Sequence, residues 1–299
     1  MDAKLIKRIE AMEPELIATL EKWIAIPSVK GEAAVGAPFG KEVRTMLDTA
    51  LADAQAMGFK VRDIDGYAGD IEMGEGDEAI AVLGHLDVVP AGDAWQTPPF
   101  TPTRDGDKIY GRGTMDDKGP AIAALYAMKA IKDAGIPLKK RIRLILGCDE
   151  ESGWEDMAYY TAHCDMPEVG FSPDASFPVI NTEKGMTHLA LHADTAAEGL
   201  QVKRMTTGER LNVIPGDCEA LVAGGAELVT KTADYAAKTG LPYSARVTDE
   251  GVLLHAEGIP GHSAYPEGRR NAIGMMLLLL RELGVTGPMK TLADAVGME

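Results

Sequence analysis

Two strand-like segments with a helix between them place the strongest constraint on how this chain can fold. AIAVLG (79–84) is apolar throughout, as expected of a strand that is covered on both faces. An apolar stripe of helical period begins near Lys118, and Asp117 is suited to cap the helix that it predicts. RIRLILG (141–147) has the pattern of a second strand. This order predicts an α/β fold with a mostly parallel sheet and helices on both faces.

The pattern changes after about residue 185. Strand-like segments then follow one another closely, with two helical segments among them, which is typical of a small α+β domain. The expected strands are 187–193, 213–223, 242–248 and 251–258, and the expected helices are 226–238 and 269–283. We therefore predict an α/β domain over residues 1–185 and a smaller α+β domain over residues 186–299.

The charge balance and the cysteine count argue against several classes of protein. The sequence has 30 basic and 46 acidic residues, a formal net charge of −16, which disfavours binding to nucleic acid and to anionic membranes. Charges interrupt every apolar run of the N-terminal segment, so it lacks the apolar core of a signal peptide. Three cysteines without CxxC spacing favour reduced thiols over disulfides or a thiolate metal site. We expect a soluble, cytoplasmic protein.

A histidine and an aspartate follow the first buried strand directly, in GHLDVVPAGDAW. His85 and Asp87 lie just past the carboxyl end of that strand, which is the edge at which open α/β sheets bind ligands. Residues two apart on an extended backbone point to the same side. This spacing allows His85 to bind a metal through one ring nitrogen while Asp87 orients the other. On its own, a histidine in this position is more often structural.

Two further segments each carry a pair of carboxylates. GRGTMDDKGP places Asp116 and Asp117 before a helix, where adjacent negative charges are costly unless a cation neutralises them. GCDEESGW ends the next strand with Glu150 and Glu151, which suits proton transfer beside a bound metal. The simple alternatives are a helix cap with a solvated aspartate for the first pair and an acidic turn for the second.

The last segment, MPEVGFSPDASFPVINTEKG, contains Asp174 in a loop where an isolated aspartate would usually be a turn residue. Taken together, however, the four segments favour a metal site. Three of them end a predicted strand or begin a helix at one sheet edge, and the fourth could reach it. They supply the imidazole and carboxylate ligands that suit zinc or its first-row neighbours.

These four motifs, in this order, resemble those of the co-catalytic metallopeptidases that include carboxypeptidase G, aminoacylase and succinyl-diaminopimelate desuccinylase. The resemblance runs nearly end to end and is closest to the PepV-type dipeptidases, which are Xaa-His or β-Ala dipeptidase-like enzymes. It implies a zinc-peptidase-like catalytic domain over residues 1–185 and a lid domain over residues 186–299. It also implies a site for two Zn²⁺ ions, with Mn²⁺ or Co²⁺ as alternatives, and a small peptide as substrate.

The resemblance further implies which residues hold the two metals. His85 and Asp174 would bind one zinc. Asp116 would bridge both ions, and Glu151 would bind the other. In the family, a cis peptide bond that does not involve proline follows the bridging aspartate, which here is the Asp116–Asp117 bond.

Catalytic and substrate-binding roles follow from the same resemblance. Asp87 would orient His85. Glu150 would act as general base toward a water that bridges the metals, and then as general acid. In the lid, Asn212 within GERLNVIPGDCEA matches a substrate-binding asparagine. His262 within GIPGHSAYPEGRRNAI matches a histidine that contacts the substrate and steadies the developing oxyanion.

The sequence departs from the family pattern in its last third. Relatives place a histidine for the second zinc and a lid arginine near the end of a longer chain, whereas no histidine follows His262 here. We therefore expect the second site to lack its usual C-terminal histidine. We also expect the catalytic domain to lack its C-terminal portion and the lid to be incomplete, as in a truncated product or a fragment of a longer reading frame.

Three functions stay open at this point. The first is a PepV-type dipeptidase, and the second is an N-acyl amino acid deacylase or desuccinylase on the same scaffold. The third is a decayed, non-catalytic metal-binding relative, which the missing histidine favours and the retained Glu150 opposes. Relatives in this family occur both as monomers and as dimers. Both a monomer and a homodimer therefore fit the sequence.

Overall fold

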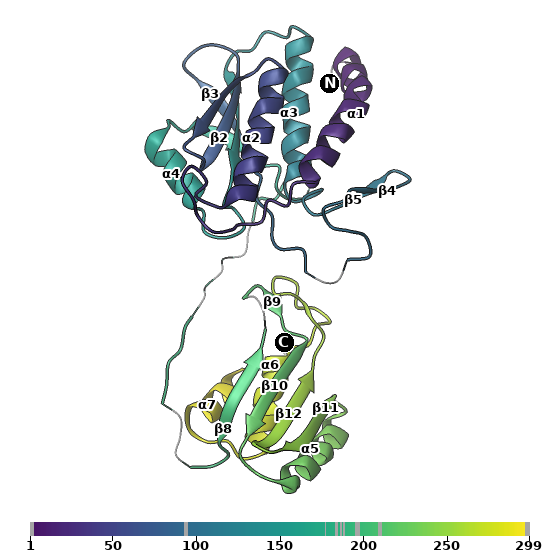
Figure 1. The fold of residues 1–299 in the computed structure, drawn as a ribbon, viewed down its shortest axis with the longest axis vertical. Helices are drawn as coiled ribbons and strands as arrows, with labels where there is room; N and C mark the ends of the chain where they lie inside the picture. Colours follow the sequence, from purple (N-terminus) through teal and green to yellow (C-terminus); the bar gives the residue numbers. More distant parts are fainter. Residues whose placement is uncertain are drawn as a thin grey trace. The chain divides into compact units, whose positions relative to one another are not determined.

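The computed structural model of the chain divides into two compact units, Met1–Asn181 and Thr182–Glu299. Each unit has its own sheet and its own hydrophobic core (Figure 1). The identification of these units as catalytic domain and lid stays a prediction. The structure describes residues 3–92, 95–176, 178–182, 185, 187, 189–194, 198–208 and 211–296.

The first unit contains a five-stranded sheet in the order β1-β2-β6-β3-β7. Its strands are β1 (Lys60–Ile64), β2 (Ala68–Met73), β3 (Ala79–His85), β6 (Arg141–Gly147) and β7 (Val169–Phe171), and β4 (Thr103–Asp105) pairs separately with β5 (Lys108–Tyr110). Strand β3 runs parallel to β6 and β7, whereas β2 runs antiparallel to β1 and β6. The α/β fold is confirmed, but the sheet is mixed and not mostly parallel.

A tight turn between β1 and β2 explains why the sheet is mixed. Asp65 and Gly66, between β1 and β2, both have positive φ, at 50° and 78°, and Tyr67 N–H donates to the carbonyl of Ile64 at 2.9 Å. Such Asp-Gly turns join antiparallel strands, so β2 returns beside β1 as a hairpin. Strand β2 was not among the strands expected from the sequence.

Helices cover both faces of this sheet, as predicted (Figure 1). The first unit contains α1 (Ala3–Ile24), α2 (Lys41–Ala56), α3 (Lys118–Asp133) and α4 (Glu155–His163). Leu144 and Leu146 of β6 face the core shared with α1, α2 and α3, whereas Ile145 packs with Tyr160 of α4 on the other side. This alternation follows from the two-residue period of a strand. The central strands are therefore buried on both faces.

The second unit is an antiparallel sheet in the order β11-β12-β10-β8, packed with helices through a common core. Its elements are β8 (Val202–Thr207), β9 (Val213–Ile214), β10 (Asp217–Val222), α5 (Ala226–Thr239), β11 (Tyr243–Thr248), β12 (Gly251–Glu257), β13 (Gly261–His262), α6 (Ala272–Glu282) and α7 (Gly287–Ala295). Strands β9 and β13 form a separate two-stranded ribbon. Among the described residues of both units, no helix combines the length and the apolar character that a membrane span requires.

Two strand predictions in this region need correction. The described residues of 187–193 belong to no strand, and Leu189 and Leu191 are 78% and 77% exposed. An apolar pattern alone does not make a strand, because the backbone also needs a hydrogen-bonding neighbour. The predicted strand 213–223 is interrupted at Pro215 and Gly216, which separate β9 from β10.

Candidate metal centre

The parallel pairing of β3 and β6 brings two of the predicted motifs together. His85, the last residue of β3, pairs with Gly147, the last residue of β6. Leu86 N–H then donates to the carbonyl of Gly147 at 2.9 Å. The two loops that follow these strands therefore start side by side, as expected when parallel strands end at the same edge.

Two glycines at these strand ends leave room for buried carboxylates. A Cβ on Gly84 would lie 2.6 Å from Asp117 Oδ2, and one on Gly147 would lie 2.5 Å from Asp156 Oδ2. Asp117 accepts a hydrogen bond from His85 N–H at 3.0 Å, and Asp156 accepts from Cys148 N–H at 2.7 Å. Both carboxylates hold the backbone at the point where a strand becomes a site loop.

The position of Asp117 corrects one expectation. Asp117 occupies the N-cap position of α3, but its side chain makes no capping hydrogen bond and is fully buried. Burial raises the pKa of its carboxyl to about 7. The Asp116–Asp117 peptide bond is cis, as the resemblance implied. A position before a helix suggests a cap, whereas in the fold the carboxylate turns back toward β3.

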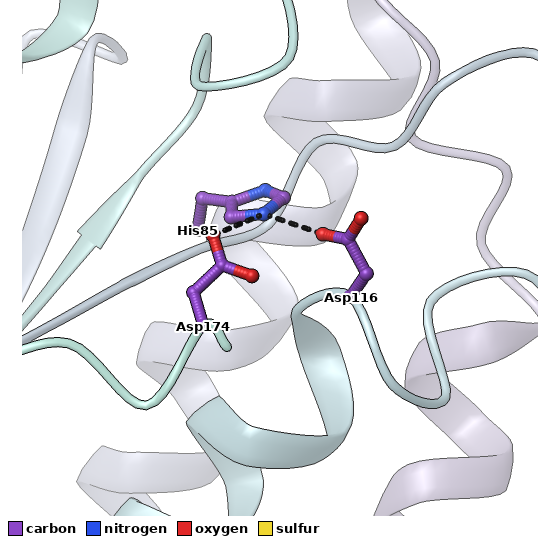
Figure 2. A group of neighbouring side chains, drawn as sticks. All are labelled: His85, Asp116 and Asp174. Atoms are coloured by element: carbon purple, nitrogen blue, oxygen red, sulfur yellow. Dashed lines mark hydrogen bonds and ion pairs between the residues drawn. The ribbon is translucent and has the colours of Figure 1, made fainter. Parts of the chain in front are cut away.

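His85, Asp116 and Asp174 form the one cluster of potential metal ligands found among the described residues (Figure 2). One ligand atom from each lies within 4.8 Å of the others. His85 Nε2 is 3.0 Å from Asp116 Oδ1 and 3.5 Å from Asp174 Oδ2. Ligands bound at about 2.0–2.1 Å around a tetrahedral zinc lie about 3.3 Å apart. The donor types and their spacing therefore fit a zinc ion.

Asp87 contacts the imidazole of His85 through two of its oxygens. His85 Nδ1 is 2.9 Å from the backbone carbonyl of Asp87 and 3.3 Å from Asp87 Oδ1. Both oxygens accept hydrogen bonds, so Nδ1 carries a proton and Nε2 faces the other two members of the cluster. The nearer contact is the carbonyl, which the residue types alone did not reveal.

The carboxylate of Asp87 also holds the acidic turn after β6. Its Oδ1 accepts from Glu150 N–H at 3.2 Å, and its Oδ2 accepts from Glu151 N–H at 3.1 Å. Asp87 itself is only 1% exposed. One buried carboxylate thus connects the histidine of the cluster with both predicted glutamates.

The charges of the cluster are strongly coupled. Burial lowers the pKa of His85, but hydrogen bonds to Asp116, Asp174 and Asp87 outweigh it and raise that pKa far above its usual value. The bond to His85 in turn lowers the pKa of Asp116. The carboxylates therefore hold His85 as a cation, a charge that a bound metal would replace.

Glu150 and Glu151 lie next to this cluster on the same turn. Glu150 Oε2 is 4.0 Å from His85 Nε2. Burial raises the pKa of Glu150 to about 7, with contributions from Asp174 and Glu151. Burial also raises the pKa of Glu151, and the charge of Asp116 adds to that shift. Both glutamates are thus part of the same acidic site, although Glu151 is not a member of the three-residue cluster.

The two remaining predicted residues come together in the second unit. In the β9–β13 ribbon His262 pairs with Val213, and Ser263 N–H donates to the carbonyl of Asn212 at 2.9 Å. His262 Nδ1 accepts from Ala264 N–H at 3.1 Å. In the neutral imidazole the ring proton is therefore on Nε2, which makes Nε2–H a hydrogen-bond donor. His262 itself is exposed.

Lys118 is a buried lysine that belongs to none of the predicted ligand or base positions. Its side chain is fully buried, and burial lowers its pKa to about 7. The sequence indicates this burial, because Lys118 precedes Ile122 and Leu125 by four and seven residues and so lies on the apolar stripe of α3. A lysine on a buried helix face requires polar partners.

Comparison with known proteins gives one family match. The model of peptidase family M20/M25/M40 matches residues 81–256. A Bacillus subtilis protein named "Putative dipeptidase YtjP" is 40% identical over 271 residues, covering 88% of this chain and 58% of that protein. A Staphylococcus aureus protein named "Putative dipeptidase SAB1611c" is 38% identical over 282 residues, covering 91% of this chain and 60% of that protein.

The chain thus spans about three fifths of the length of these two relatives. Among solved structures, human carnosine dipeptidase 1 matches with a TM-score of 0.47 and 26% identity. That match covers 56% of this chain and 40% of the human protein.

Proposed function

The chain belongs to peptidase family M20/M25/M40, and from this premise we propose that it carries the catalytic metal centre of a dipeptidase. The observation that carries the proposal is the cluster of His85, Asp116 and Asp174, with Glu150 4.0 Å from the histidine. The names of the two bacterial relatives favour a dipeptide over an N-acyl amino acid as substrate.

In this proposal His85 and Asp174 would hold one zinc, and Asp116 would be shared with a second ion. Glu151 would be the other ligand of that second ion, and Mn²⁺ or Co²⁺ would suit the same imidazole and carboxylate donors. When bound, the metals supply Lewis-acid chemistry at the scissile carbonyl.

Glu150 moves the proton in this mechanism. A base works best when its pKa lies near the working pH, and burial brings the pKa of Glu150 to about 7 in the metal-free protein. Glu150 accepts a proton from the attacking water and then donates it to the amine that leaves. Asp87 keeps Glu150 in place through the hydrogen bond from Glu150 N–H.

Asn212 and His262 bind the substrate in this proposal. The hydrogen bond from Ala264 N–H to His262 Nδ1 supports this role, because it leaves Nε2–H as the donor that an oxyanion requires. The short ribbon also keeps the two residues together, since the carbonyl of Asn212 accepts from Ser263 N–H.

The test is hydrolysis by the zinc-loaded chain, measured on a panel of dipeptides and a matched panel of N-acetyl amino acids. We expect dipeptides to be cleaved faster, and faster cleavage of the N-acetyl compounds would favour the deacylase alternative. Glu150→Gln should keep the bound zinc and lower kcat by about 10²- to 10⁴-fold. Glu155→Gln, an exposed glutamate at the start of α4, is the control and should leave kcat unchanged.

A result that contradicts the proposal is undiminished dipeptide hydrolysis by Glu150→Gln. Bound zinc without any hydrolysis of either panel by the unmodified chain would instead favour a non-catalytic relative.

A further inference from the structure

A short N-terminal segment contacts all three loops that surround the metal centre. We name this segment, residues 23–30, the brace. It comprises the last residues of α1 and the turn that follows them. It lies outside residues 81–256, the part of the chain matched by the family model.

The first contact of the brace is with the loop after β3. Ser28 is fully buried, and its Oγ donates to the carbonyl of Leu86 at 2.6 Å. The carbonyl of Ser28 accepts from Val88 N–H at 3.0 Å. These two bonds bracket Asp87, and Leu86 itself separates His85 from Asp87. Ser28 thus holds the backbone on both sides of the residue that orients the histidine.

The second contact is with the start of α3. Lys118 Nζ donates to the carbonyls of Trp23 and Ile26, at 2.9 Å and 2.7 Å. The last carbonyls of a helix lack intrahelical partners, so the buried ammonium finds acceptors where α1 ends. Lys118 follows Asp116 by two residues. Its contacts with the brace therefore position the segment that carries the bridging aspartate.

The third contact is with the loop after β6. Lys30 Nζ donates to Asp149 Oδ1 at 2.7 Å, and the Asp149 side chain is fully buried. Asp149 directly precedes Glu150, and its Oδ2 also accepts from Glu155 N–H at 3.2 Å. A buried carboxylate that lost its cationic partner would be costly, so the ion pair holds the turn in one arrangement.

We propose that the brace is a positioning element that sets the relative placement of the three loops bearing His85, Asp116 and Glu150. The proposal rests on the proposed function of the site. Its strength is the pattern of contacts, since in each of the three loops the brace contacts a residue within two positions of a candidate metal ligand or base. A metal site needs ligands placed to within about 0.2–0.5 Å, and the brace is a support that contacts all three loops.

The test uses variants of the 299-residue chain and two measurements. Ser28→Ala and Lys30→Met remove one contact each. Lys30→Arg keeps the charge that pairs with Asp149. Lys22→Met is the matched control, because its ion pair with Asp53, at 2.6 Å compared with 2.7 Å for Lys30 and Asp149, joins α1 to α2 instead of to a site loop.

The first measurement is backbone amide exchange in metal-free protein. Ser28→Ala should speed exchange in residues 86–88, and Lys30→Met should speed it in residues 149–151. The second is zinc affinity by chelator competition, which should weaken by about 10- to 100-fold in both variants. Lys30→Arg should restore most of the loss, and Lys22→Met should match the unmodified chain in both measurements.

Exchange rates and zinc affinities for Ser28→Ala and Lys30→Met that equal those of Lys22→Met would overturn the proposal. If Ser28→Ala does not fold, Lys30→Met decides, because Lys30 is partly exposed and its loss leaves no cavity in the core. If the unmodified chain binds no zinc, the proposed function is contradicted, whereas the metal-free exchange rates still test the brace.

Discussion

The loops around His85 and the ribbon around His262 show two ways in which a fold prepares a histidine. His85 is 2% exposed, and three carboxylates surround it, which together raise its pKa and hold it as a cation. His262 is exposed, and a single backbone N–H determines which ring nitrogen carries its proton.

The difference concerns what each histidine can bind. Surrounding carboxylates favour a cation at His85, either a proton or a metal ion. A donated hydrogen bond at Nδ1 leaves His262 with an outward-directed donor, which suits a negatively charged or carbonyl oxygen. The same side chain therefore suits opposite partners in the two units because its neighbours differ.

Removal of the buried histidine should have the largest effect. Zinc sites with four ligands bind with about 10–16 kcal/mol, or about 3 kcal/mol per ligand, so His85→Ala should weaken zinc binding by roughly 10²-fold or more. Zinc-dependent hydrolysis should then disappear at ordinary metal concentrations. Chelator competition measures the affinity, and zinc binding equal to that of the unmodified chain would show that His85 is not a ligand.

Removal of the exposed histidine should affect turnover and leave metal binding intact. If His262 donates to the oxyanion, His262→Ala should lower kcat by about 10²-fold while zinc affinity is unchanged. Steady-state kinetics and the same competition assay separate the two effects. A loss of zinc affinity in this variant would contradict the proposal that His85 binds the metal and His262 does not.

Substitution of the residue that links His85 to the glutamates should have an intermediate effect on the metal. In Asp87→Asn one carboxylate oxygen becomes an NH₂ group, which cannot accept from the N–H of Glu150 or Glu151. We expect zinc affinity to fall by about 10- to 100-fold. Asp63→Asn, an exposed aspartate at the end of β1, serves as the control in the same titration.

The smallest expected effect is on stability as pH changes. Glu150 and Asp117 have a pKa of about 7 in the folded, metal-free protein, above their ordinary values of 4.5 and 3.8. Between about pH 4.5 and 7 the folded state therefore binds more protons than the unfolded state. Stability should fall as pH rises through this window, because the unfolded state gives up its protons first.

The measurement is the thermal midpoint of the metal-free chain between pH 4.5 and 7, where a decrease is expected. Each 1 kcal/mol of lost stability lowers the midpoint by roughly 2–4 °C in domains of about 150–250 residues. In Glu150→Gln the thermal midpoint should decrease less over the same pH range. A midpoint that rises across the window would show that the burial of these carboxyls does not control the stability of the first unit.

The sequence was most informative where chemistry and chain order coincide. The apolar strand at 79–84, the helix that begins at Lys118 and the strand at 141–147 predicted the crossover that joins β3 to β6. Once those strands are parallel, His85 and Glu150 must emerge at one edge. Their proximity was predictable because it depends on strand direction and not on details of packing.

Other features depended on which segments become hydrogen-bonding neighbours. The sheet is mixed because the Asp65-Gly66 turn folds β2 back beside β1. Residues 187–193 have an apolar pattern, but the described ones belong to no strand. In both cases local propensity was insufficient, because the hydrogen-bonding neighbour decides whether an apolar segment becomes a strand and in which direction it runs.

By itself, then, the sequence determined the α/β class, the edge at which the site forms and the residue types that can hold a metal there. Only the tertiary structure decided that Asp117 supports β3 instead of capping α3, that Asp87 binds both glutamate amides, and that residues 23–30 join the three site loops. The physical reason is range. Apolar period and motif spacing are local, whereas a buried polar group must find its partner wherever the fold brings one, here up to 119 residues away.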